Sequence, residues 1–292
     1  MMYDHVKNRT MSQYCSAIFL AGVLFWTQAA HALDLNTTDD FPYALIPATE
    51  LALAPAGVIL LTVGGILETT AEPPTRTDVL ALDKNDIPAW DRSAIYHYSS
   101  AANTTSDIGL ITMQIAPTLL ALSQLPRIRT RWRNLLTLAA MYSEAAMLTL
   151  GATQITKILA NRPRPFLYND SAPMTAKTES PYKSFFSGHT STSFCSAVFI
   201  STVFADLYPR SPWRFVVIGT SLSIASVTGM MRYFAGKHFP SDILVGAAVG
   251  SLFGYVVPYL HRKRVWHENE VDVAILPDIS SRFAGLHVVL GL

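Results

Sequence analysis

The sequence Arg232-Tyr-Phe-Ala-Gly-Lys-His238-Phe-Pro-Ser-Asp242 lies between two apolar runs, at about residues 214–231 and 243–260. It places a guanidinium, an imidazole and a carboxylate where one hydrophobic helix is expected to end and the next to begin. Runs of this length approach the roughly 20 residues that cross the hydrocarbon core of a membrane. The stretch therefore predicts two membrane helices joined by a short connection that carries reactive side chains.

Two further polar segments lie at the ends of apolar runs: Lys157-Ile-Leu-Ala-Asn-Arg-Pro-Arg164-Pro165 and Phe186-Ser187-Gly188-His189. Lysine and arginine neutralise phosphate oxygens, and arginine does so through two parallel hydrogen bonds. Ser187 is a candidate N-cap of a helix whose free N–H groups favour an anion. A carboxylate beside one imidazole makes its other nitrogen a better nucleophile or base, and the second histidine can protonate a leaving oxygen. Together the segments predict a site that binds and attacks a tetrahedral oxyanion.

The three segments resemble the motifs of the type 2 phosphatidic acid phosphatase (PAP2) and vanadium haloperoxidase superfamily. Those motifs are Lys-x6-Arg-Pro, Pro-Ser-Gly-His and Ser-Arg-x5-His-x3-Asp. The alignment selects Arg164 over Arg162, although both precede a proline. Phe186 stands in place of the family's proline, and Met231 in place of its serine. The matching stretch covers about residues 134–260, close to half of the chain.

The resemblance implies a role for each matched residue. His238 is the expected nucleophile, which forms a phosphohistidine, and Asp242 is expected to orient and activate it. His189 is expected to protonate the leaving group and then to activate water. The residues expected to hold the phosphoryl oxygens are Lys157, Arg164, Ser187, Gly188 and Arg232. No metal ion or other cofactor is required, because the cationic side chains already neutralise the phosphate.

The composition points to a membrane protein. Half of the 292 residues are hydrophobic and only 15% are charged, whereas soluble domains carry about 25% charged residues. The net charge of only +1 argues against a nucleic-acid partner. The two cysteines, Cys15 and Cys195, show no zinc-ligand spacing and are not expected to form a disulfide.

Hydrophobic runs define the predicted spans. Five are long enough or nearly so, at about residues 108–125, 134–151, 190–206, 214–231 and 243–260, and a shorter run lies at 51–67. We therefore predict an all-α, membrane-embedded helical bundle of five or six spans with the active site at one membrane face. The alternative, a soluble helical bundle, is disfavoured by so few charges. Glu144 lies inside one run, and we interpret it as an interhelical hydrogen-bonding group.

Basic links indicate the orientation. Residues 126–133, residues 261–264 and the link with Arg210 and Arg214 fall on one side if the helices alternate. Positive charge favours the cytoplasm. The motifs then face the other side, which in a bacterium is the periplasm of the inner membrane.

The chain divides into four predicted parts: a signal peptide at 1–32, an N-terminal segment at 33–107 with one apolar run and an extramembrane loop, a PAP2-type core at 108–264, and a tail at 265–292. An uncleaved anchor is the alternative to the signal peptide. A cleaved signal and a full crossing at 51–67 would put the motifs in the cytoplasm. We therefore expect 51–67 to cross incompletely.

Three connecting segments carry weaker predictions. Within the loop at 68–107, Asn103-Thr-Thr matches a glycosylation sequon. The loop at 166–186 is either a lid or a solvated connector. The tail is expected to form a hairpin around Pro277-Asp278.

The predicted function is hydrolysis of a phosphomonoester or pyrophosphate, on a lipid, by a membrane phosphatase. Phosphatidate, phosphatidylglycerophosphate, undecaprenyl pyrophosphate, lipid A and soluble phosphate esters are not distinguished by the sequence. One alternative is a vanadate-dependent haloperoxidase, in which His238 would bind vanadate. Another is a non-enzymatic membrane protein that keeps the fold.

Overall fold

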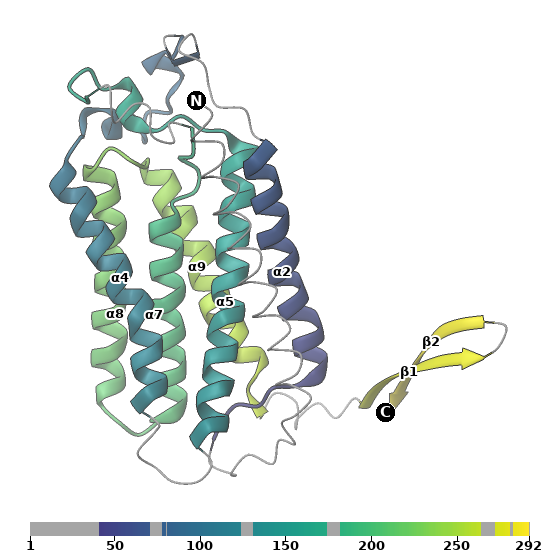
Figure 1. The fold of residues 1–292 in the computed structure, drawn as a ribbon. Coiled ribbons are helices and arrows are strands. Elements are labelled where there is room, and N and C mark those ends of the chain that lie inside the picture. The colour runs from purple at the N-terminus through teal and green to yellow at the C-terminus, as the bar shows by residue number, and fades with distance from the viewer. Residues whose placement is uncertain are drawn as a thin grey trace, which may run out of the picture. The chain divides into compact units, whose positions relative to one another are not determined.

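In the computed structural model, the chain forms a bundle of helices that lie side by side (Figure 1). The structure describes residues 41–70, 78–79, 81–123, 131–173, 182–263, 272–280 and 283–291. Six helices in these ranges are long and apolar enough to cross a membrane. They are α2 (Pro47–Thr70), α4 (Ser100–Ser123), α5 (Arg131–Ala160), α7 (Gly188–Leu207), α8 (Trp213–Phe234) and α9 (Pro240–Leu260). The predicted helical membrane bundle is confirmed, with six candidate spans among the described residues.

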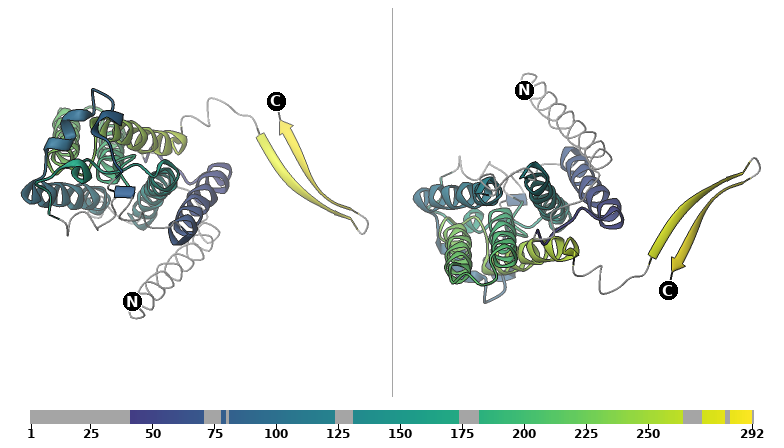
Figure 2. Two further views of the ribbon diagram at one scale, coloured as in Figure 1. Left: turned by 90° about the horizontal axis from the view of Figure 1, so that it is seen from above. Right: turned by 90° about the horizontal axis from the view of Figure 1, so that it is seen from below.

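The helices alternate in direction, so one end of the bundle gathers the ends of α2, α5 and α8 and the starts of α4, α7 and α9 (Figure 1). Helix α7 packs against α4, α8 and α9, while α2 packs along α5, as the views along the bundle also show (Figure 2). Short 3-10 helices occupy the connections at this end: η1 (Lys84–Asp86), η2 (Arg92–Tyr96) and η3 (Pro165–Tyr168). All three polar segments of the sequence therefore lie at one end of the bundle.

Small residues bring α7 and α9 together. A Cβ added at Gly250 would lie 1.9 Å from the carbonyl oxygen of Ser191, and one at Gly254 would lie 2.4 Å from that of Cys195. Only glycine permits such an approach of two helix backbones. The close contact fixes the start of α9 beside the start of α7, where Ser187 N donates to the carbonyl of Asp242 at 3.1 Å.

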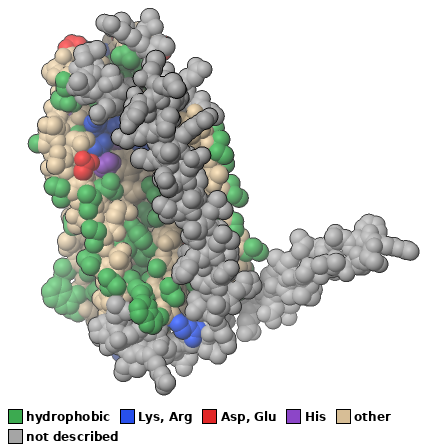
Figure 3. Space-filling view, in the orientation of Figure 1, with side chains coloured by type: hydrophobic (Ala, Val, Ile, Leu, Met, Phe, Trp, Pro, Cys, Tyr) green, Lys and Arg blue, Asp and Glu red, His purple; other side chains and the backbone are tan. Residues whose placement is uncertain are grey.

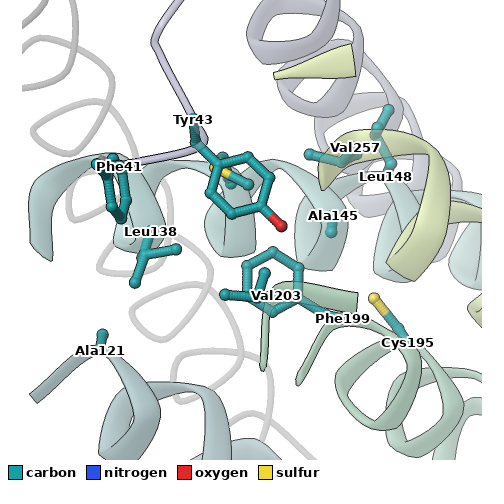
Figure 4. Close-up of a cluster of buried hydrophobic side chains, with 11 residues drawn as sticks. Phe41, Tyr43, Ala121, Leu138, Ala145, Leu148, Cys195, Phe199, Val203 and Val257 are labelled. Atoms are coloured by element: carbon teal, nitrogen blue, oxygen red, sulfur yellow. The ribbon is translucent and has the colours of Figure 1, made fainter. Parts of the chain in front are cut away.

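A cluster of buried apolar side chains packs between the helices in the half of the bundle away from the three polar segments (Figure 4). Tyr43 and Phe199 place their rings side by side in this view, between side chains from α5 and α7. The buried Tyr43 hydroxyl has a hydrogen-bond partner, because it donates to Asp206 Oδ2 at 2.5 Å. The remaining labelled members are Phe41, Ala121, Leu138, Ala145, Leu148, Cys195, Val203 and Val257.

Helices α4 and α5 extend well beyond one end of their apolar runs. Helix α4 begins at Ser100, not near residue 108, so the end of the predicted loop at 68–107 is helical. Its start is polar, which hides it from a hydrophobicity pattern, and Ser99 Oγ accepts from Ala102 N at 3.2 Å as an N-cap does. Helix α5 continues to Ala160, so Lys157 lies in its last turn and does not follow it.

The incomplete crossing at 51–67 stays a prediction, but the helix that contains this run is long and apolar enough to cross a membrane fully. Helix α2 has 24 residues and continues through Pro55. Pro55 lies in the helix interior, where it removes one internal hydrogen bond and its ring crowds the carbonyl of the preceding turn, and packing along α5 stabilises the helix around it.

The tail forms the predicted hairpin, but with a different turn. Strands β1 (Asp272–Ser280) and β2 (Phe283–Gly291) pair antiparallel. Pro277 lies within β1 opposite Leu286, so the strands connect through residues 281–282 and not through Pro277-Asp278. The predicted signal peptide at 1–32 and most of the basic link at 126–133 lie outside the described residues.

Candidate active site

The ends of four helices bring the predicted site residues together. Lys157 lies in the last turn of α5 and Arg232 in the last turn of α8, while Asp242 lies in the first turn of α9. The ammonium of Lys157 is 3.7 Å from the position that a Cβ of Gly188 would occupy, at the start of α7. In the space-filling view, basic, acidic and histidine side chains gather near this end, above a mostly hydrophobic surface (Figure 3).

Three cations, Lys157, Arg164 and Arg232, form what we call the cationic group. Arg232 is 4% exposed, and its Nε is buried without a hydrogen-bond partner among the described residues, as is the Nε of Arg164. Lys157 donates to the carbonyl of Lys183 at 3.3 Å. Within the described ranges, no carboxylate comes within ion-pair distance of Lys157 or Arg164. Buried positive charge without a close counter-ion is costly, and an anion bound beside these side chains would reduce that cost.

His238 lies beside this group with one nitrogen already engaged. It is 1% exposed, and its Nδ1 lies 2.7 Å from the carbonyl oxygen of Ser184. A carbonyl only accepts, so Nδ1 carries the proton and Nε2 keeps its lone pair. Burial, and then the charges of Arg164, Lys157 and Arg232, hold the pKa of His238 well below its ordinary value. The result is a neutral imidazole with a free nitrogen, as a nucleophile requires.

Asp242 supports His238 indirectly. Its Oδ2 lies 3.7 Å from His238 Nδ1, which is too long for a hydrogen bond. That oxygen instead accepts from Ser184 Oγ at 2.6 Å and from Phe239 N at 2.8 Å. Because Phe239 is the N-cap of α9, His238 precedes the helix and does not share a turn with Asp242. The expected carboxylate–histidine contact therefore passes through Ser184, which binds both.

Arg162 belongs to a separate set, Asp91, Arg162, Ser241 and Asp242, which we call the acidic network. Its Nη1 donates to Asp242 Oδ1 at 2.5 Å and its Nη2 to Asp91 Oδ2 at 2.8 Å. The Arg162 guanidinium also lies over the ring of Phe239, 4.1 Å from its centroid. Both carboxylates compete for this cation, so Arg162 is not available to a phosphate. The choice of Arg164 for phosphate binding stays a prediction, and among the described residues Arg164 forms no ion pair with Asp91 or Asp242.

Asp91 anchors the acidic network to the start of α9. Ser241 donates to it twice, from the backbone N at 3.0 Å and from Oγ at 2.6 Å. Burial alone would raise the pKa of Asp91, but the hydrogen bonds from Ser241 and Arg162 outweigh it and hold the pKa below its usual range. From the sequence alone, Asp91 is expected only in an extramembrane loop, with no role at the site.

Helix α4 supplies side chains that the motifs did not predict. His189 Nε2 lies 2.7 Å from Asp107 Oδ1. Arg232 Nη1 donates to Asn103 Oδ1 at 2.7 Å and to Ser106 Oγ at 3.2 Å. Asn103 in turn donates to Asp107 Oδ2 at 3.0 Å. The asparagine of the predicted sequon is therefore part of the site, and α4 orients both a histidine and an arginine.

Ser187 is the N-cap of α7, as predicted, and its Oγ accepts from Thr190 N at 3.4 Å and contacts Thr190 Oγ1 at 2.8 Å. Phe186 is buried, 3% exposed. Gly236 has φ of +68°, and a Cβ there would lie 2.2 Å from the carbonyl oxygen of His97, so glycine is needed for the turn between Arg232 and His238. Nothing in the structure explains Met231.

Fold and site together define a helical membrane protein with a buried cationic centre at one end of its bundle. Residues 135–266 match the model of the PAP2 superfamily, which identifies this part of the chain as a PAP2-superfamily domain and confirms the resemblance.

Two protein sequences are similar to parts of the chain. A lipid A 1-phosphatase from Porphyromonas gingivalis is 41% identical over 68 residues, which are 23% of this chain and 14% of that protein. A probable diacylglycerol pyrophosphate phosphatase 1 from Schizosaccharomyces pombe is 30% identical over 115 residues, 36% of this chain and 40% of that protein. The chain thus spans less than half the length of either relative.

Two solved structures are similar in fold. A transmembrane PAP2-type phosphatidylglycerolphosphate phosphatase from Bacillus subtilis has 21% identity and a TM-score of 0.45, with 70% of this chain and 95% of that chain covered. For LpxE from Aquifex aeolicus the identity is 20% and the TM-score 0.41, with 59% and 96% covered.

Proposed function

We propose that this protein is a membrane phosphatase that hydrolyses a phosphate monoester or pyrophosphate carried by a lipid, without a metal ion or other cofactor at the site. One observation carries the proposal: a buried neutral histidine, His238, lies beside a cationic group in which Lys157 and Arg164 form no ion pair among the described residues. Such a pair can hold a phosphoryl group and attack it at the same place.

In the first step, Nε2 of His238 attacks the phosphorus atom, and the bond from phosphorus to the leaving oxygen breaks. The cationic group and the N–H groups at the start of α7 hold the three phosphoryl oxygens. His189 gives its proton to the leaving oxygen, and Asp107, 2.7 Å from its Nε2, orients the ring.

In the second step, His189 takes a proton from a water molecule, which attacks the phosphohistidine. The bond from Nε2 to phosphorus breaks, inorganic phosphate leaves, and His238 returns to its neutral form. Ser184 holds the imidazole in the same tautomer throughout, because its carbonyl accepts from Nδ1.

A lipid substrate is supported by the position of the site and by the sequence relatives. The site lies at the ends of the spanning helices, at the depth where a lipid head group would lie. Both sequence relatives are named for phosphatases that act on lipids. Neither observation selects one lipid.

The site is proposed to face away from the cytoplasm, towards the periplasm if the host is a bacterium. The opposite end of the bundle carries Arg133, Arg210, Arg214, Arg262 and Lys263, and such positive charge favours the cytoplasm. We propose that α2 crosses the membrane fully, which in this orientation starts it on the cytoplasmic side. A cleaved export signal before α2 would not give that start, so the proposal argues against cleavage after residue 32.

Phosphate release by the purified protein in detergent micelles tests the proposal. The panel contains phosphatidate, phosphatidylglycerophosphate, undecaprenyl pyrophosphate, lipid A and a soluble phosphate ester. We expect release from at least one lipid, faster than from the soluble ester. Activity confined to the soluble ester would contradict the lipid assignment, and no release from any substrate would contradict the phosphatase. Bromide oxidation that depends on added vanadate would instead support the haloperoxidase.

A further inference from the structure

A second polar cluster lies at the opposite end of the bundle from the candidate active site. It consists of Glu50 in the first turn of α2, Glu144 in the middle of α5 and His261 at the C-cap of α9. His261 Nε2 lies 2.8 Å from Glu50 Oε1 and 3.4 Å from Glu144 Oε2. One ligand atom from each of the three residues lies within 4.8 Å of the others. Three helices distant in sequence thus aim carboxylates and an imidazole at one point.

The carboxylate oxygens of this cluster are not satisfied by the protein. The side chains of Glu144 and His261 are 0% exposed, and that of Glu50 is 12% exposed. Both oxygens of Glu144 and Oε2 of Glu50 are buried without a hydrogen-bond partner among the described residues. The sequence predicted an interhelical hydrogen bond for Glu144, and the structure places its carboxyl group against that of Glu50 and 3.4 Å from His261 Nε2. Buried carboxylate oxygens without partners are costly and call for a ligand.

His261 has the geometry of a metal-binding histidine. Its Nδ1 lies 2.8 Å from the carbonyl oxygen of Val257, to which it donates. Metal-ligating histidines commonly donate their other ring N–H to a backbone carbonyl, which turns the lone pair of Nε2 towards the metal. Two ligands about 2.0–2.2 Å from a tetrahedral zinc ion lie roughly 3.4 Å apart. The distance from Nε2 to Glu144 Oε2 has this value, and the distance to Glu50 Oε1 reaches it after a small side-chain movement.

The charge balance also favours a cation. No lysine or arginine forms an ion pair with either glutamate in the part of the chain that the structure describes. Arg262, next to His261, is engaged by Asp206 at 2.8 Å. Two carboxylates and a protonated imidazole would leave one negative charge buried. Two carboxylates, a neutral imidazole and a divalent cation leave none.

We propose that Glu50, Glu144 and His261 bind one divalent transition-metal ion of the zinc class, which ties α2, α5 and α9 together at this end of the bundle. Mixed imidazole and carboxylate ligands suit zinc and its neighbours, and a second oxygen of either glutamate completes four-fold coordination. The site is structural, and no step of the proposed hydrolysis passes through it.

The test uses the full-length protein, purified in detergent without a metal-affinity tag and stripped with a chelator. Zinc and cobalt(II) are added back to the wild type and to the variants Glu144→Gln and His261→Gln. Asp206→Asn is the matched control, because Asp206 is a partly buried carboxylate at the same end that accepts from Tyr43 and Arg262. Bound metal is counted by elemental analysis, and the cobalt absorption spectrum reports the ligand geometry.

We expect one metal ion per chain in the wild type and in Asp206→Asn, a visible cobalt spectrum typical of four-fold coordination, and at most a tenth of this binding in the two site variants. A hundredfold excess of metal over its dissociation constant should raise the unfolding midpoint of the wild type by roughly 5–10 °C. Phosphate release well below that temperature should not change with metal, which separates this proposal from the proposed function.

Two results would overturn the proposal. The first is less than a tenth of an ion per wild-type chain together with an unfolding midpoint that zinc does not move, which would make the cluster an ion pair with a protonated imidazole. The second is equal metal binding by the wild type and Glu144→Gln, which would place the ion elsewhere. Because both are measured on the wild type or relative to it, a variant that fails to fold does not rescue the proposal.

Discussion

Arg162 and Arg164 are two residues apart, each precedes a proline, and yet they lie in opposite surroundings. Arg162 belongs to the acidic network, where Asp91 and Asp242 balance its charge and Ser241 completes the hydrogen bonds. Arg164 belongs to the cationic group, where its Nε has no partner among the described residues. The same side chain is thus structural in one place and free to bind a ligand in the other.

The two regions have different tasks. The acidic network holds the side chains of the site in position, and the cationic group is proposed to bind the phosphate. The acidic network fixes the start of α9 and, through Ser184, the ring of His238. The cationic group places positive charge near the same ring and lowers the pKa of His238, and Lys157 and Arg164 form no ion pair among the described residues. The acidic network therefore keeps the side chains in place before an anion binds. The anion is required only to balance the charge of the cationic group. The predictions below separate these two contributions.

The largest effect is expected at His238. This residue lies 3.7 Å from Asp242 of the acidic network, and the charges of the cationic group lower its pKa. Replacing it with alanine removes the proposed nucleophile, so phosphate release should fall roughly 10⁴-fold or more. The assay uses whichever substrate the panel identifies, with the unfolding midpoint and the elution volume in detergent as controls for folding. Full activity in a folded His238→Ala variant would disprove the phosphohistidine.

The two arginines give the sharpest test of the comparison itself. Arg164→Ala should lower kcat/KM by roughly 10²- to 10³-fold, because one charge that stabilises the transition state is lost. Its unfolding midpoint should be unchanged or higher, since a buried unbalanced charge is removed. Arg162→Ala leaves Asp91 and Asp242 buried without their cation and should reduce the free energy of unfolding by about 3–5 kcal/mol.

Both variants are measured by thermal unfolding and by phosphate release at a temperature where each is folded. The reverse pattern, with Arg164→Ala unstable and Arg162→Ala stable but unable to bind substrate, would exchange the two assignments.

The motif-bearing helices were predictable because each couples a long apolar run to a polar end. The starts of α7 and α9 and the end of α8 lie within three residues of their predicted positions. The resemblance also placed the three cations and two histidines that the structure brings together. Local signals sufficed there, since each functional residue lies next to the hydrophobic segment that positions it.

The α4 side of the site could not be predicted in the same way. Asn103, Ser106 and Asp107 lie on a polar helix start that looks like a loop, 50 or more residues before the first motif. Asp91 lies in no motif or periodic pattern of the sequence, and its contact with Arg162 appears only in the folded chain. Contacts between segments this far apart depend on how the helices pack, which one sequence does not specify. One signal was available for α4. Its polar residues directly precede the apolar run at about 108–125, as the polar residues of the three motifs adjoin their own runs.

Asp107 should matter less than the cations, because it acts through His189. Asp107→Asn is expected to slow release of a lipid phosphate by roughly 10²-fold, since the histidine loses its orienting carboxylate. A substrate with a good leaving group needs no proton from His189, so its rate should fall much less. An equal loss on both substrates would indicate that Asp107 acts by holding Arg232, whose Nη1 lies 3.9 Å away.

The smallest effect, a change in pH dependence, tests the charge on the cationic group. His238 attacks only when neutral, so protonation inactivates it and its pKa sets an acid limit on kcat/KM. Burial and the charges of Arg164, Lys157 and Arg232 lower that pKa, so the limit should lie below pH 6.5, the ordinary value for histidine. Removing a nearby positive charge makes protonation easier, which raises the pKa. Arg164→Ala should therefore move the acid limit to higher pH.

Arg162→Lys is the control for this shift, because Arg162 is not among the charges that act on His238. Its acid limit should stay at the position found in the wild type. The ionisation of the substrate is the same in all three proteins, so it cancels in the comparison of their profiles. If Arg164→Ala and Arg162→Lys move the limit equally, or neither moves it, the cationic group does not set the charge state of His238. The low pKa of His238 would then come from burial alone. The cationic group would bind the phosphate without affecting the proposed nucleophile.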